Sequence, residues 1–197
     1  MTGGQATPPA RFIPASRKFV TATGILKTSI HQTVRMNGAH LHLIVTHLPV
    51  LGVGFGALLL AFGLIRKNRV VQQTALGVLV LAGLAAGAAY LTGEGAEEVM
   101  ENQLGAGKAF LELHEEAGLF GLAAAGLAGL LALIVLARGR NARPLSRGLV
   151  ALNLVFALLA SGTLAWVANL GGQIGHPEIR NGEGARLGER DEAEHQP

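Results

Sequence analysis

The stretch LPVLGVGFGALLLAFGLI, residues 48–65, contains no charged side chain. Three further uncharged stretches follow it, at residues 70–93, 117–137 and 148–175. An α-helix rises about 1.5 Å per residue, so roughly 20 residues cross the hydrocarbon core of a bilayer. A chain of 197 residues lacks the apolar surface to bury four helices that are hydrophobic all round. The pattern therefore predicts an all-α fold, an integral membrane four-helix up-down bundle that occupies residues 36–176.

The distribution of charge predicts an orientation for this bundle. The spans are expected at about residues 42–65, 70–92, 115–137 and 147–170. Two of the connections, residues 66–69 and 138–147, carry seven basic residues and no acidic one. Cytoplasmic loops are rich in lysine and arginine. We therefore expect an inner (cytoplasmic) membrane protein with these two connections inside and both termini outside.

The two ends of the chain are set apart from the bundle. Residues 1–35 carry five basic and no acidic side chains, which opposes the predicted orientation. Three interpretations stay open for them: a transit-like peptide, a true translation start at Met36, or a basic surface helix. Residues 177–197 are polar and are predicted to be a disordered tail.

The composition restricts the chemistry that the chain can support. It contains no cysteine, which excludes thiolate-bound metal sites, disulfides and thiol catalysis. No phosphate-binding glycine loop, HExxH spacing or Ser–His–Asp arrangement is present, so no catalytic residue is assigned. Basic residues are not interleaved with aromatics, and no nucleic acid is expected as a partner. The expected partners are the lipid bilayer, a second copy of the chain, and a redox partner protein or membrane complex.

Histidines and carboxylates gather at the outer end of the predicted bundle. His42 and His47 belong to the start of the first span and point about 140° apart on a helix. We expect His47 to be the buried one, with His114 and His176 reaching the same end from two other spans. Imidazole is a common ligand of metal ions and of haem iron.

Three carboxylates are predicted to accompany these histidines. Glu94, Glu98 and Glu115 lie next to the mouth of the bundle, where an unpaired carboxylate is costly. They are candidate metal ligands. Glu98 and Glu115 are also expected to accept the second ring N–H of the histidine ligands.

Four motifs resemble those of known membrane proteins. They are LHLIVTHLPV (41–50), YLTGEGAEE (90–98), HEE (114–116) and GGQIGHPEI (171–179). Together they resemble an uncharacterised family of four-span bacterial membrane proteins. They are more distantly similar to a predicted four-helix membrane domain that is sometimes found with Rieske iron–sulfur partners. This resemblance implies a redox partner and raises the expectation of electron transfer.

Three functions are compatible with these observations. The first is an electron-transfer protein that holds b-type haem between His47 and either His114 or His176, with His42 as a further candidate. The second is a non-haem site for zinc, iron or copper, made of the same histidines with Glu94, Glu98 or Glu115. The third is a non-catalytic scaffold subunit of a membrane complex. An electron-transfer or binding subunit is expected rather than a self-contained enzyme.

Overall fold

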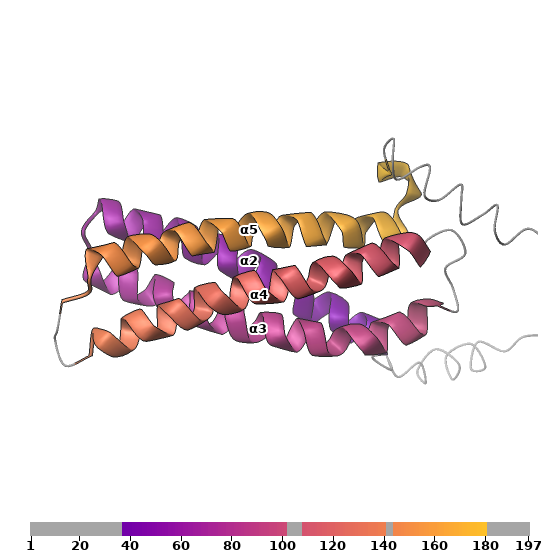
Figure 1. The fold of residues 1–197 in the computed structure, drawn as a ribbon, viewed down its shortest axis with the longest axis horizontal. Helices are drawn as coiled ribbons and strands as arrows, with labels where there is room; N and C mark the ends of the chain where they lie inside the picture. Colours follow the sequence, from indigo (N-terminus) through magenta and orange to yellow (C-terminus); the bar gives the residue numbers. More distant parts are fainter. Residues whose placement is uncertain (1–36, 102–107, 141–143, 181–197) are drawn as a thin grey trace, which may run out of the picture. The chain divides into compact units, whose positions relative to one another are not determined.

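The computed structural model describes residues 37–101, 108–140 and 144–180, and Figure 1 shows their arrangement. The elements are α2 (Gly38–Ile65), α3 (Arg69–Glu101), α4 (Lys108–Arg138), α5 (Arg147–Gly175) and the short 3-10 helix η1 (Pro177–Ile179). The chain divides into two units, Met1–Arg35 and Met36–Pro197, and all these elements belong to the second. The predictions for residues 1–35, and those for the tail beyond Arg180, lie outside the described residues.

The four long helices form an up-down bundle. Each helix packs against the next one along the chain, and α2 also packs against α5. In Figure 1, α2 and α4 run in one direction and α3 and α5 in the other. Every one of the four is long and apolar enough to cross a membrane. The predicted all-α, four-helix, up-down membrane architecture is therefore confirmed.

The bundle has a small-residue interior and an apolar exterior. Its core consists mainly of alanines together with a few larger side chains, among them Val53, Leu60, Leu76 and Leu79. Many large apolar side chains point outward instead, and Leu91, Ile65 and Leu58 are 80%, 78% and 71% exposed. Such an exterior suits a lipid solvent, in which association relies on close packing of small residues rather than on hydrophobic burial.

Glycines bring α3 and α4 into backbone contact. A Cβ atom built on Gly83 would lie 3.1 Å from the carbonyl oxygen of Ala125 and 3.3 Å from the Cα of Gly129. A larger residue at either glycine would push the two helices apart. This close approach holds the helices that carry the candidate site in a fixed relation.

The helices extend beyond the uncharged stretches at the end that holds the acidic residues. α3 has 33 residues and continues through Gly93 and Gly95 to Glu101, and α4 begins at Lys108 rather than near residue 115. At about 1.5 Å per residue, α3 is roughly 50 Å long, which exceeds the ~30 Å hydrocarbon core. The extra turns carry histidine and glutamate side chains on helical rather than loop backbone.

Candidate functional site

The candidate site lies at the end of the bundle where α2 and α4 begin and α3 and α5 finish, toward the right of Figure 1. Two histidines meet there, His42 from α2 and His114 from α4. At about 1.5 Å per residue, each lies roughly 35 Å from the opposite end of its helix. The two rings are therefore at the same level, and both are half-buried.

The backbone of a neighbouring helix holds each ring. The Nδ1 atom of His42 lies 3.0 Å from the carbonyl oxygen of Ala89 and 3.2 Å from Oγ1 of Thr92, both on α3. The Nδ1 atom of His114 lies 3.0 Å from the carbonyl oxygen of Val167 on α5. Because a carbonyl oxygen only accepts, both Nδ1 atoms carry the proton and donate it. In the neutral ring this leaves the Nε2 lone pair of each histidine available as a ligand.

The two imidazoles face each other across the bundle. Their ring centroids are 6.5 Å apart and their planes make an angle of 86°, an edge-to-face arrangement. The hydrogen bonds join α2 to α3 and α4 to α5, while the ring contact joins α2 to α4. The pair thus connects all four helices at one level.

Glycine and threonine complete the surroundings of the pair. A Cβ on Gly171 would lie 3.0 Å from Cε1 and 3.2 Å from Nδ1 of His114, so a side chain at this position would crowd the ring. A Cβ on Gly93 would lie 3.7 Å from Cε1 of His42, an ordinary contact. The hydroxyl of Thr92 donates to the carbonyl oxygen of Ala89 at 2.9 Å, the oxygen that also receives the His42 proton. Gly171, Gly93 and Thr92 are not among the site residues predicted from the sequence, although all three lie in the quoted motifs.

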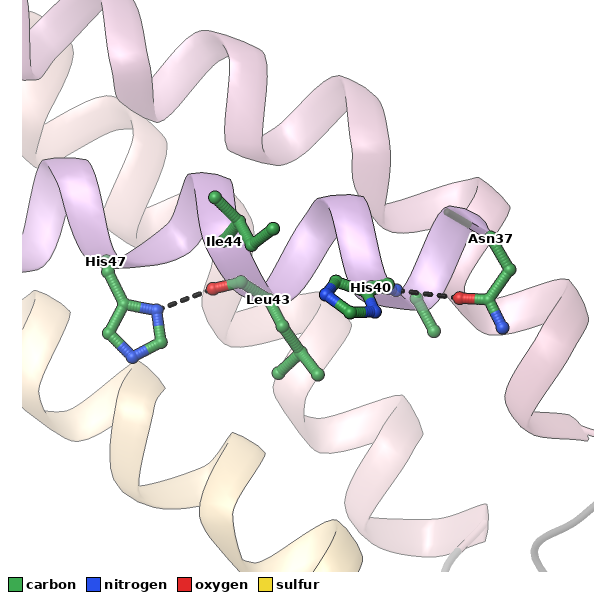
Figure 2. Close-up of a pocket in the computed structure, with 6 residues that line it drawn as sticks. Asn37, His40, Leu43, Ile44 and His47 are labelled. Carbon is green, nitrogen blue, oxygen red and sulfur yellow. Dashed lines mark hydrogen bonds between the residues drawn. The ribbon is translucent and has the colours of Figure 1, made fainter. Parts of the chain in front are cut away.

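His47 lies on the outer face of α2, away from this pair. Its side chain is exposed and its Nδ1 donates to the carbonyl oxygen of Leu43 in the same helix, as Figure 2 shows. A groove on this face is lined by the N-cap residue Asn37 and by Ala39, His40, Leu43, Ile44 and His47 from the start of α2. The prediction that His47 is the buried histidine is wrong. Pro49 and Val53 mark the face of α2 that is buried in the bundle. His42 follows them at helical spacing and contacts α3, whereas His47 lies on another face of the helix.

His176 also stays away from the pair. It caps the C-terminal end of α5, is exposed, and its Nδ1 lies 2.8 Å from Oε1 of the equally exposed Glu178. The pKa of the Glu178 carboxyl is lowered, first by a hydrogen bond from its own backbone N–H and then by the His176 side chain.

Arg180, which is not among the residues predicted from the sequence, closes the end of α5. Its Nε donates to the carbonyl oxygen of Gln173 at 2.8 Å, and its Nη2 donates to that of Ile174 at 3.1 Å. The guanidinium carbon lies 4.5 Å from the centroid of the buried Phe110 ring on α4, a cation–π contact. The side chain thereby satisfies C-terminal carbonyls of α5 and fixes η1 against the start of α4.

The candidate carboxylates are exposed side chains at this end: Glu94, Glu98 and Glu115. Backbone carbonyls of Ala89 and Val167, rather than Glu98 and Glu115, accept the Nδ1–H of the paired histidines. Within residues 37–101, 108–140 and 144–180, no three His, Asp or Glu side chains form a group that could hold a metal ion. What the described residues do bring together is two imidazoles.

No family model, no curated protein and no solved structure matches this chain. The resemblance to four-span bacterial membrane proteins therefore stays a prediction. What is established is a multi-pass membrane architecture with four candidate spans.

Proposed function

We propose that this membrane protein is an electron-transfer subunit that binds b-type haem, with His42 and His114 as the axial ligands. The observation that carries the proposal is the pairing of these two rings, each with Nδ1–H bonded to a backbone carbonyl. Histidine ligands of metals almost always donate their other ring N–H in this manner, which fixes the tautomer and raises the basicity of the ligand nitrogen.

The number of ligands favours haem over a bare metal ion. A structural zinc ion takes four protein ligands, and a catalytic zinc takes three. The described residues bring two imidazoles together and no third His, Asp or Glu that could complete a metal site. Haem iron needs only axial ligands from the protein, because the macrocycle supplies the others. Two histidines are thus sufficient for haem and insufficient for a closed zinc site.

The two rings are close neighbours at one level of the bundle, with 6.5 Å between their centroids. Gly93 and Gly171 lie beside the rings, and the absence of a side chain at Gly171 is what lets the His114 ring pack against α5. Cofactor sites of helical bundles are built in this way, from side chains on facing helices.

Bound haem would supply a one-electron carrier at the outer end of the bundle. The chain itself holds the ligand nitrogens in place through Ala89, Thr92 and Val167. The electron donor or acceptor would be the redox partner protein or membrane complex that the sequence resemblance implies.

Absorbance spectroscopy of the full-length protein, purified from haem-replete cells, tests this proposal. The reduced protein is expected to show sharp α and β bands, which disappear in His42→Ala and in His114→Ala. His47→Ala is the matched control on the same helix and should keep the bands, as should His176→Ala. Far-UV circular dichroism confirms that each variant is folded.

Two other results would contradict haem binding. A colourless protein with near-stoichiometric metal, lost in His42→Ala and His114→Ala, would indicate a non-haem zinc, iron or copper site. A colourless and metal-free protein would leave the pair with a structural role, in a scaffold subunit whose four helices it ties together.

A further inference from the structure

Among the described residues, those at the end of the bundle opposite the histidine pair carry only positive charge. The described cations there are Arg66, Lys67, Arg69, Arg138, Arg140 and Arg147. The chain has no acidic residue before Glu94, and none between Glu116 and Glu178. No acidic side chain of either connection, or of the membrane-spanning parts of the helices, can therefore neutralise this end.

The structure draws the two basic connections together. Nη2 of Arg69, at the start of α3, donates to the carbonyl oxygen of Gly139 at 2.9 Å. Gly139 stands between Arg138 and Arg140 in the chain, so this bond joins the two basic connections.

The turn between α2 and α3 is held by its own hydrogen bonds. The side chain of Gln72 donates to the carbonyl oxygen of Gly63 at 2.9 Å, and Asn68 accepts from the backbone N–H of Val71 at 3.2 Å. Lys67 lies in the left-handed region with a φ of 50°. The cations of this turn therefore extend from a defined backbone rather than from a loose segment.

Such a concentration of like charge requires counter-ions. Five of the six side chains are exposed: Arg66, Lys67, Arg138, Arg140 and Arg147. Both α3 and α5 begin at this end without an acidic residue in the first turn, so no carboxylate there offsets the cations. The anions closest to the end of a membrane-spanning bundle are the phosphates of lipid headgroups, and clustered basic residues at such a position attract anionic lipids.

We propose that this basic end, through its five exposed side chains, binds the phosphate headgroups of anionic phospholipids. Arginine is suited to this ligand, because its guanidinium group makes bidentate hydrogen bonds to phosphate. The proposal does not depend on haem binding at the other end, and either one can fail without the other.

Lipid selectivity of the purified full-length chain tests this inference. The protein is reconstituted in phosphatidylcholine bilayers that contain spin-labelled phosphatidylglycerol or spin-labelled phosphatidylcholine, and the motionally restricted fraction of each label is compared. We expect a severalfold preference for phosphatidylglycerol. This preference should decrease as ionic strength rises, because exposed charges are screened by salt.

Substitutions assign the selectivity to this end. The triple variant Arg66→Gln, Arg138→Gln and Arg140→Gln should lose most of the preference. The matched triple variant with lysine at the same positions keeps the charge and should retain most of it. Arg69 is left unchanged because its bond to Gly139 is structural.

Equal selectivity of the glutamine variant and the unmodified protein would overturn the proposal. A preference that salt does not affect would also overturn it. If the glutamine variant does not fold, a preference of the unmodified protein that salt leaves unchanged would still overturn the proposal.

Discussion

His42 and His114 meet edge to face, with 6.5 Å between their ring centroids, although they belong to helices that are not neighbours in the chain. Each ring is oriented by a carbonyl oxygen of the helix that follows its own, Ala89 on α3 for His42 and Val167 on α5 for His114. A carbonyl that is already bonded within its helix keeps a second lone pair, so it can accept the imidazole proton without breaking the helix. The same arrangement therefore occurs twice, once between α2 and α3 and once between α4 and α5.

Gly171→Ala should weaken the bundle at this pair. The new Cβ would lie 3.0 Å from Cε1 of His114, and the bond from Nδ1 to Val167 keeps the ring from moving away. Overpacking of this kind costs about 1–3 kcal/mol. Denaturant titration in mixed micelles should record that loss in the free energy of unfolding.

Gly162→Ala is the matched control for this substitution. Gly162 lies on the same helix, and a Cβ there would meet no atom within 4 Å. Alanine favours a helix over glycine by up to about 1 kcal/mol. The control should therefore be as stable as the unmodified protein or slightly more so. If Gly171→Ala behaved in the same way, the close contact with His114 would have no effect on the free energy of unfolding.

The fold could be predicted from the sequence because a single property determines it. Four charge-free stretches long enough to cross a bilayer leave few alternatives, and the basic connections between them separate one helix from the next. The helix ends could not be predicted in the same way. Charged residues such as Glu94 and Glu112 are excluded from the hydrocarbon but not from a helix, so α3 and α4 continue into the aqueous region beyond the uncharged stretches.

The candidate site could be predicted only in part, because residue type does not reveal which way a helix is rotated. His42 and His47 are both in the first span, and the sequence favoured His47 because it lies deeper. The buried residues Pro49 and Val53 show which face of α2 packs against the other helices, and His42 follows them at helical spacing. The carbonyl oxygens of Ala89 and Val167 could not be predicted as hydrogen-bond acceptors from the sequence, because every residue carries a backbone carbonyl.

Cysteine labelling should reveal the orientation that the loops predict. In this cysteine-free chain, single cysteines at Asn68 and Gly105 report opposite sides of the membrane. Because residues 66–69 and 138–147 are basic and free of acids, a membrane-impermeant maleimide should label Gly105→Cys in intact cells, and Asn68→Cys only after lysis. Labelling of Asn68→Cys in intact cells would reverse the assignment, and with it the predicted outer location of both termini.

The exposed pair of His176 and Glu178 should show a defined pH response. The pKa of Glu178 is lowered in the folded protein, so the interactions of its carboxylate are present above the usual pKa of a glutamate. They are lost as the pH falls through the lowered value. An NMR titration of the ¹³C-labelled carboxyl group should therefore give a pKa below that of an unfolded peptide.

His176→Ala separates the two causes of this shift. The hydrogen bond from the Glu178 backbone N–H is the larger cause and remains in the variant, so the pKa should rise only part of the way. A full return to the peptide value would mean that the histidine is the main cause. No change at all would mean that the bond to His176 does not form in solution.

Asn153 should tolerate an apolar residue and reject a charged one. Its side chain is fully buried between α4 and α5, and its Nδ2 donates to the carbonyl oxygen of Ala128 at 2.8 Å. Among the described residues its Oδ1 has no hydrogen-bond partner, and leaving this buried oxygen unpaired lowers the stability of the present structure.

Leucine has the same heavy-atom skeleton without polar atoms, so Asn153→Leu should change the free energy of unfolding by less than about 1.5 kcal/mol. Asn153→Asp has the same shape but replaces the donor by an acceptor and adds charge inside a span, and it should cost about 3 kcal/mol or more. Unfolding in mixed micelles measures both variants, and equal losses for leucine and aspartate would mean that the bond to Ala128 is itself the stabilising feature.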